Sequence, residues 1–174
     1  MPSRRNLTIS EQALVQMVTS SIEVYKKEAI GLILGQKHKK HYLAKDAINF
    51  QSAKRGYVSV DVPQARINRL NYVLGRLTDS RVIGDFHSHP DFPETLSSTD
   101  KEDLKVSGLT LTVLTVVRKA GRKGHDWHIK DKALSGFVGN RYHVKLLAFE
   151  YDKKAGKFFR IKIVCPHLKK LNRL

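Results

Sequence analysis

Residues 84–90 read GDFHSHP, and this stretch decides both the fold and the chemistry that the sequence supports. Its two histidines, His87 and His89, are two residues apart. In an extended strand, alternate side chains lie on the same face, so both imidazoles can approach one metal ion. The sequence therefore predicts a strand that ends at a metal site.

A carboxylate follows the two histidines. The intervening residues 90–99 read PDFPETLSST: the prolines interrupt a strand, and the hydroxyl residues suit the start of a helix. A helix beginning near Ser98 carries Asp100 in its first turn, where the helix dipole favours an ionised carboxylate. Two imidazoles and a carboxylate suit a zinc ion whose fourth position is open to water. We predict one Zn²⁺ bound by His87, His89 and Asp100.

Hydrolysis at such a site needs a proton acceptor for the attacking water. The six glutamates are Glu11, Glu23, Glu28, Glu94, Glu102 and Glu150. Glu28 precedes AIGLILG, residues 29–35, a run whose length and apolar character favour a buried strand. We expect its carboxylate to be partly desolvated, which raises its pKa, while a nearby metal lowers it again. Glu28 also suits the end of a helix beside Lys26 and Lys27, which is the alternative.

Residues 28–35 (EAIGLILG), the GDFHSHP stretch, Ser97 and Asp100 together resemble the JAMM (MPN+) zinc metalloproteases. This family includes the proteasome-lid deubiquitinase and archaeal relatives that remove small ubiquitin-like modifiers. The resemblance covers roughly residues 10–117. It implies zinc binding by His87, His89 and Asp100, general acid and base catalysis by Glu28, and stabilisation of the tetrahedral intermediate by Ser97. It also implies an α/β fold with a mixed β-sheet flanked by helices, on a JAMM/MPN, cytidine-deaminase-like core.

The periodicity of apolar residues places these motifs on helices and strands. The expected elements are a helix capped by Ser10 and running to about Lys27, strands near 29–36 and 40–48, a short strand at 57–60, a helix after Pro63 with Ile67, Leu70, Val73, Leu74 and Leu77 on its apolar face, the strand of His87 and His89, the helix of Asp100, a central strand at 109–117, and a hairpin of 144–151 with 157–164. We expect the zinc at the sheet edge, where strand ends meet the third helix.

Several polar residues near the motif also suit roles that involve neither catalysis nor metal binding. Ser97 suits a helix cap or turn as well as catalysis, and Ser98 is an alternative cap. Asp85 has the parity of the two histidines, yet we expect a solvated aspartate there. Asp91 and Glu94 read as exposed loop charges. Two further pairs, His38/His41 and His125/His128, read as surface histidines, and one cysteine excludes a deaminase-type Cys-x-x-Cys site.

Length and composition predict one domain over residues 1–174, with a short basic tail at about 165–174. No apolar run approaches the roughly 20 residues of a membrane span, and the polar start lacks the core of a signal peptide. The single cysteine, Cys165, reads as a packing residue and suits a cytoplasmic location. The oligomeric state stays open.

The net charge of +16 and a pI of about 10.1 indicate an acidic partner. Complementary charge would steer ubiquitin or an acidic ubiquitin-like protein toward the site. The expected function is therefore zinc-dependent cleavage of isopeptide or C-terminal amide bonds of such modifiers, with a substrate-contacting loop within 118–141. The alternative is a basic nucleic-acid-binding or interaction module with a structural metal, although no reader motif or aromatic platform supports it.

Overall fold

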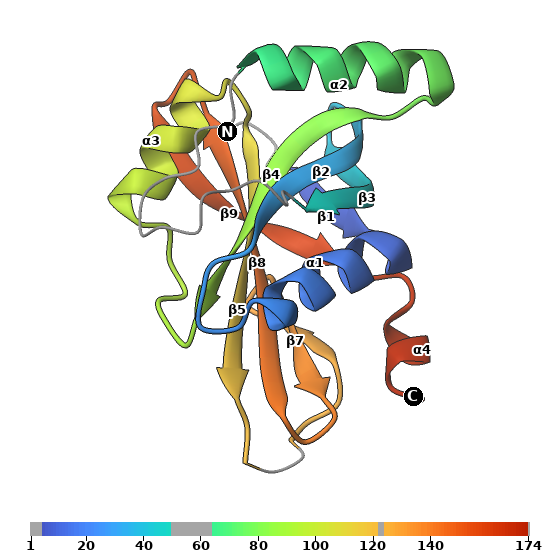
Figure 1. Cartoon of the computed structure of the whole chain (residues 1–174), viewed down its shortest axis with the longest axis vertical. Helices are drawn as coiled ribbons and strands as arrows, with labels where there is room; N and C mark the ends of the chain where they lie inside the picture. The colour runs from blue at the N-terminus through green and yellow to red at the C-terminus, as the bar shows by residue number, and fades with distance from the viewer. Residues whose placement is uncertain (1–4, 50–63, 122–123, 174) are drawn as a thin grey trace.

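A computed structural model describes residues 5–49, 64–121 and 124–173, and Figure 1 shows how its elements are arranged. The elements are β1 (Asn6–Ile9), α1 (Glu11–Glu23), β2 (Ile30–Lys37), β3 (His41–Asn49), α2 (Gln64–Leu77), β4 (Arg81–Pro90), α3 (Ser98–Val106), β5 (Leu111–Lys119), β6 (His128–Lys130), β7 (Ala133–Val138), β8 (Tyr142–Asp152), β9 (Lys157–Val164) and α4 (Leu168–Leu171). This order confirms most predicted elements, including the β8–β9 hairpin. The strand predicted at 57–60 lies outside the described residues, as does Pro63.

The nine strands of the described residues form one sheet that closes on itself. Their order is β5-β4-β2-β3-β1-β9-β8-β7-β6, and β5 pairs additionally with β8. This last pairing runs along the whole of β5, from Leu111 opposite Glu150 to Lys119 opposite Tyr142. The mixed α/β architecture is confirmed, but the sheet is barrel-like and is not specifically the cytidine-deaminase-like core that we expected. Closure leaves β5 without a free edge, because β4 occupies its other side.

Helix α1 begins as predicted and ends earlier. The Ser10 hydroxyl accepts a hydrogen bond from the Ala13 N–H at 3.0 Å, which is the expected N-cap. Its buried residues include Leu14 and Met17, each of which stabilises the fold by roughly 2 kcal/mol through apolar burial. The helix ends at Glu23 rather than Lys27, and Lys26 then adopts a φ of 81°. This turn leads directly into β2.

The core between β3, β2 and β4 is packed tightly around Phe86, the residue before the first histidine. Phe86 is fully buried. A Cβ on Gly31 of β2 would lie 2.2 Å from the Ile48 carbonyl oxygen and 2.3 Å from the Phe86 ring. Only glycine therefore allows this close approach. The packing fixes the register of β4 on β2, in which Ile30 lies opposite His87.

Helices α2 and α3 share a second apolar cluster with β2 and β4. Ile67 of α2 and Leu104 of α3 are both buried in it. The predicted apolar face of α2 is wrong at Val73 and Leu77, which are 49% and 75% exposed. The helix lies along one end of the molecule in Figure 1, so its last turns have less sheet beneath them. No helix in the described residues is long and apolar enough to cross a membrane.

Candidate metal centre

The three predicted metal ligands converge where β4 ends and α3 begins. The Nε2 atoms of His87 and His89 lie 3.6 Å and 3.5 Å from Oδ2 of Asp100. Strand β4 has neighbours on both sides, because it pairs with β2 and with β5. Asp100 and the buried Leu104 are four residues apart and share one face of α3, so packing of Leu104 turns Asp100 toward the strand. The predicted ligand set is therefore brought together by the fold.

The spacing of these atoms fits a zinc ion. Tetrahedral ligands at about 2.0–2.1 Å from zinc are about 3.3 Å apart, close to the two separations above. One potential ligand atom from each residue lies within 4.8 Å of the others. Nε2 of His87 is buried, and within the described chain it has no hydrogen-bond partner. A buried, unpaired ring nitrogen facing a carboxylate is what a metal ligand requires.

The ring of His89 is held in the orientation that metal binding needs. Its Nδ1 lies 2.8 Å from the Pro93 carbonyl oxygen. A carbonyl can only accept, so Nδ1 carries the hydrogen, and Nε2 is the ring nitrogen that faces Asp100 and is left to bind a metal. Burial lowers the pKa of His89, but Asp100 and the Pro93 carbonyl outweigh burial and raise it. The His89 ring therefore has the Pro93 carbonyl at Nδ1 and the Asp100 carboxylate facing Nε2.

Asp100 is held ionised by its place in the helix. It forms a capping box with Ser97: the Ser97 N–H donates to Oδ2 at 2.6 Å, and the Ser97 hydroxyl accepts from the Asp100 N–H at 3.1 Å. Burial opposes ionisation, yet His87, His89 and the Ser97 N–H hold the pKa of Asp100 well below its usual range. Ser97, rather than Ser98, is thus the N-cap of α3.

Glu28 lies beside the ligands but is more exposed than they are. Its Oε1 is 4.0 Å from Nε2 of His89, and its side chain is 54% exposed. A side chain that is about half exposed is partly shielded from water, and Glu28 lies just before β2 rather than within it. The Ala29 N–H donates to the Ser88 hydroxyl at 2.8 Å, and the Ser88 N–H donates to the Ala29 carbonyl at 2.9 Å. These two bonds hold Glu28 against the histidine strand.

Asp85 is not the solvated residue that we expected. Its Oδ1 is buried, because β4 is an interior strand and Asp85 faces Leu32 on one side and Thr112 on the other. Burial raises its pKa to about 6, although His87 and Thr112 oppose the shift. In the sequence, the two-residue spacing that places Asp85 on the same strand face as His87 and His89 was the signal that its side chain lies near the site.

The loop after His89 is anchored by charged residues that sequence reasoning treated as solvent-exposed. Arg118 donates through Nε to the Asp91 carbonyl at 2.7 Å and through Nη2 to Glu94 at 2.8 Å, and its guanidinium lies 4.0 Å from the centre of the Phe92 ring. Lys145 also pairs with Glu94. Asp91 and Glu94 are therefore not free loop charges, and Pro93, which bonds His89, sits between them.

Asp91 also ties this loop to the segment that carries Glu28. Its two carboxylate oxygens accept hydrogen bonds from the Tyr25 hydroxyl and from Lys26 Nζ, both at 2.7 Å. Asp91 and Lys26 both have positive φ angles, 67° and 81°, which non-glycine residues rarely adopt. The ion pair between Lys26 and Asp91 therefore links the segment of Glu28, the predicted base, to the loop that follows His89.

Comparison with known proteins identifies the class to which this fold and site belong. The family model of prokaryotic homologs of the JAB domain matches residues 10–130. The chain therefore belongs to this family, which includes metalloproteases. The solution structure of protein DSY2949 from Desulfitobacterium hafniense is similar in fold, with a TM-score of 0.58 and 15% identity over 91% of this chain and 92% of that one. A comparison with curated proteins gives no match.

Proposed function

We propose that this protein is a zinc-dependent hydrolase that cleaves isopeptide or C-terminal amide bonds of ubiquitin or ubiquitin-like modifiers in the cytoplasm. The observation that carries the proposal is the convergence of His87, His89 and Asp100 beside the carboxylate of Glu28. Three protein ligands are the number found at catalytic zinc sites, whereas structural zinc sites have four. The ligand set therefore favours chemistry over a purely structural metal.

A zinc ion held by these residues would supply a Lewis acid and lower the pKa of a bound water toward about 7. The chain supplies the proton transfers. Glu28 lies beside His89 and is exposed enough to meet both water and substrate. We assign it the removal of a proton from the attacking water and its delivery to the leaving amine, which leaves poorly without a proton.

Ser97 is placed to stabilise the oxyanion while it caps the helix. Its Oγ accepts a hydrogen bond from the Asp100 N–H, so its own hydroxyl hydrogen is still available to donate. No acceptor within the described chain takes that hydrogen. We therefore assign Ser97 a hydrogen bond to the developing oxyanion, in addition to its cap.

The charge of the chain supports an acidic protein substrate. With a net charge of +16, the protein attracts an acidic modifier, and complementary charge accelerates encounter. The region 118–141, where we expected a contact loop, contains the hairpin of β6 and β7. The exposed Phe92, which lies between His89 and Asp100, is a better-placed contact for the substrate.

The experiment is a cleavage assay on a panel of conjugates. The panel comprises ubiquitin conjugates, conjugates of a prokaryotic ubiquitin-like protein, a sulfur-carrier precursor and a small peptide, each with and without a chelator. We expect cleavage of at least one modifier substrate, its loss with chelator, and its return when Zn²⁺ is added. Cleavage that persists after the metal is removed, or no cleavage of any modifier by the zinc-loaded protein, contradicts the proposal.

A further inference from the structure

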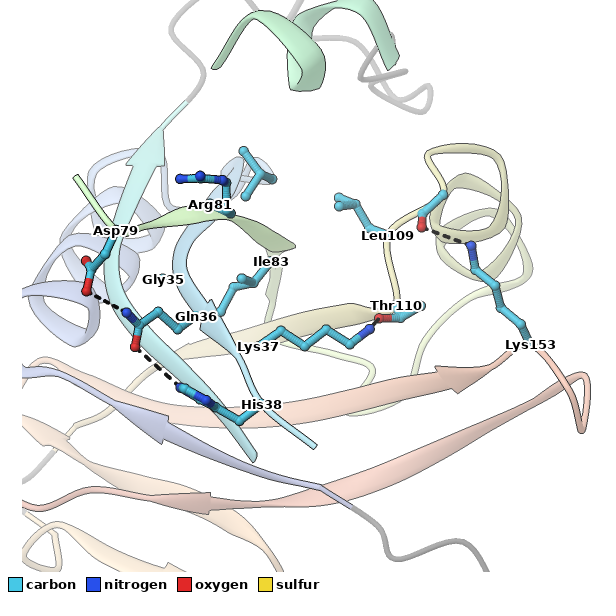
Figure 2. Close-up of a pocket in the computed structure, with 12 residues that line it drawn as sticks. Gly35, Gln36, Lys37, His38, Asp79, Arg81, Ile83, Leu109, Thr110 and Lys153 are labelled. Atoms are coloured by element: carbon cyan, nitrogen blue, oxygen red, sulfur yellow. Dashed lines mark hydrogen bonds between the residues drawn. The ribbon is translucent and has the colours of Figure 1, made fainter. Parts of the chain in front are cut away.

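A second hollow in the molecule lies away from the metal ligands. It has a volume of about 700 Å³ and lies between the end of β2, the start of β4, the loop 108–110 and the β8–β9 turn (Figure 2). Arg81 in its wall is six residues before His87 on β4, roughly 20 Å at about 3.3 Å per residue. We call it the basic pocket, and define it by Lys37, Arg81, Lys153, Thr110 and Leu109.

Three cations of the basic pocket are held in place by neutral oxygens. Lys37 Nζ donates to the Thr110 hydroxyl at 2.8 Å, Lys153 Nζ donates to the Gly108 carbonyl at 3.2 Å, and Arg81 Nη1 donates to the Ser80 carbonyl at 2.7 Å. Within residues 5–49, 64–121 and 124–173, none of the three forms a salt bridge. These positive charges are therefore positioned but not neutralised.

Two carboxylates in or near the wall of the basic pocket are already paired. Asp79 in the pocket wall accepts from Lys45 at 2.8 and 3.0 Å and from Gln36 at 2.6 Å. Glu150 accepts from Arg5 and from the Tyr42 hydroxyl. Each carboxylate is matched by a cation, Lys45 or Arg5, that does not line the basic pocket. Its charge is therefore positive, and an anion entering it meets unbalanced cations.

Lys37 is more firmly oriented than an ordinary surface lysine. The Tyr42 hydroxyl gives its hydrogen to Glu150 at 2.8 Å and lies 3.1 Å from the Thr110 oxygen, which leaves Thr110 to donate to Tyr42 and to accept from Lys37. Burial, with repulsion from Arg5 and Lys153, lowers the pKa of Lys37, although Glu150 opposes the shift. A bound anion would relieve this repulsion, and a pre-oriented cation loses less entropy on binding.

Part of the wall of the basic pocket is apolar. Val82, Ile83 and Leu109 line it, and all three are largely buried. The volume falls within the usual range for small-molecule sites, which is roughly 300–1,000 Å³. We propose that the basic pocket binds a small ligand with a phosphate group on an apolar or aromatic body, the phosphate meeting Lys37 and Lys153 beside the loop 108–110 and the body meeting the apolar part of the wall.

The test is a nuclear magnetic resonance titration of the full chain with AMP in the presence of a chelator, with adenosine as the uncharged control. We expect AMP to shift amide signals of residues 35–38 and 108–110 with a Kd of about 1 mM or tighter, and adenosine to shift none of them. Lys37→Gln with Lys153→Gln should weaken AMP binding about tenfold or more, since each removes a charge-assisted contact.

Two control variants separate this site from general charge and from the metal centre. Lys154→Gln with Lys157→Gln removes two exposed lysines of the same hairpin and should leave AMP affinity unchanged. Asp100→Asn should also bind AMP like the wild type. The proposal is overturned if AMP shifts none of these signals, if both double variants weaken it equally, or if Asp100→Asn abolishes it. Tighter binding of a polyglutamate peptide than of AMP at the same residues would also overturn it and indicate a protein partner.

Discussion

Glu28 differs from the metal ligands in its surroundings, since its side chain is about half exposed whereas those of His87, His89 and Asp100 are 12%, 5% and 16% exposed. An exposed carboxylate contributes little to the ligand cluster itself. Metal binding and proton transfer are therefore separable by substitution at this one position.

We expect Glu28→Gln to retain bound zinc and to lose cleavage by about 10²- to 10⁴-fold, because the amide cannot take a proton from water. Metal content and turnover on a modifier conjugate, measured on the same sample, check this. Glu23→Gln, an exposed glutamate at the end of α1, is the matched control and should keep full activity. Full activity of Glu28→Gln would show that another group is the base.

The metal ligands were predictable from the sequence, whereas their supporting contacts were not. Strand parity and a helix start were enough to bring His87, His89 and Asp100 together. The role of Ser88, which bonds the backbone beside Glu28, depends on a contact between residues 59 positions apart in the chain. The burial of Asp85 is not predictable from the sequence, because it depends on the strand order, which gives β4 a neighbour on both sides.

The loop between β4 and α3 depends on one arginine of β5. Arg118 contacts the backbone of Asp91, the carboxylate of Glu94 and the ring of Phe92. Pro93, whose carbonyl fixes the His89 ring, lies within this anchored stretch. Arg118 is therefore a positioning residue for the metal site and need not touch substrate.

We expect Arg118→Gln to weaken zinc binding about 10- to 100-fold, the usual cost of losing support for a metal ligand. Zinc affinity measured by competition with a chromophoric chelator checks this. Arg141→Gln is the control, because Arg141 is exposed and lies outside the loop. Equal affinity of the wild type and Arg118→Gln would show that the loop holds its shape without the arginine.

The ion pairs of Glu94 predict a pH dependence of the stability of this loop. Burial raises the pKa of Glu94, but hydrogen bonds from Lys145 and Arg118 outweigh it and lower the pKa below 4.5. Because the pKa is lower in the folded state, the stabilisation is fully present above the unfolded value and is lost as pH falls through the folded one. The difference in unfolding free energy between wild type and Glu94→Gln, from urea titrations, should therefore shrink below pH 4.5. A constant difference would contradict this ion-pair account.

Helices and strands with strong local signals are predictable from the sequence, whereas features that depend on tertiary pairing are not. Ser10 and the apolar run 29–35 were enough to locate α1 and β2. The closure of the sheet depends on pairing between β5 and β8, which no local pattern encodes. The exposure of Leu77 likewise depends on where the sheet lies beneath α2.

The positive charge of the whole chain has several distinct local roles. Arg118 and Lys145 anchor the ligand loop, Lys170 pairs with Glu11 at 2.6 Å, and Lys37 with Lys153 lines the basic pocket. The pairing of Lys170 also holds part of the predicted basic tail against α1. Cations that are paired with carboxylates of the same chain, such as Arg118, Lys145 and Lys170, contribute less to a continuous surface for nucleic acid.

We expect binding to mixed-sequence DNA to be weak and to collapse as salt is raised, since contacts to phosphates alone release counterions. Fluorescence anisotropy with labelled duplex DNA at low and physiological ionic strength checks this. Tight binding that resists salt would favour the alternative of a nucleic-acid module with a structural metal.

Zinc stoichiometry is the sharpest test of the metal site formed by His87, His89 and Asp100. The number of zinc ions per chain is measured by mass spectrometry of metal content, after dialysis, for wild type and for Asp100→Asn, which preserves the size of the side chain. The arrangement of His87, His89 and Asp100 predicts one zinc ion in the wild type and much less than one in the variant. Wild-type protein that binds no zinc, or a variant that binds as much as the wild type, would contradict the assigned site.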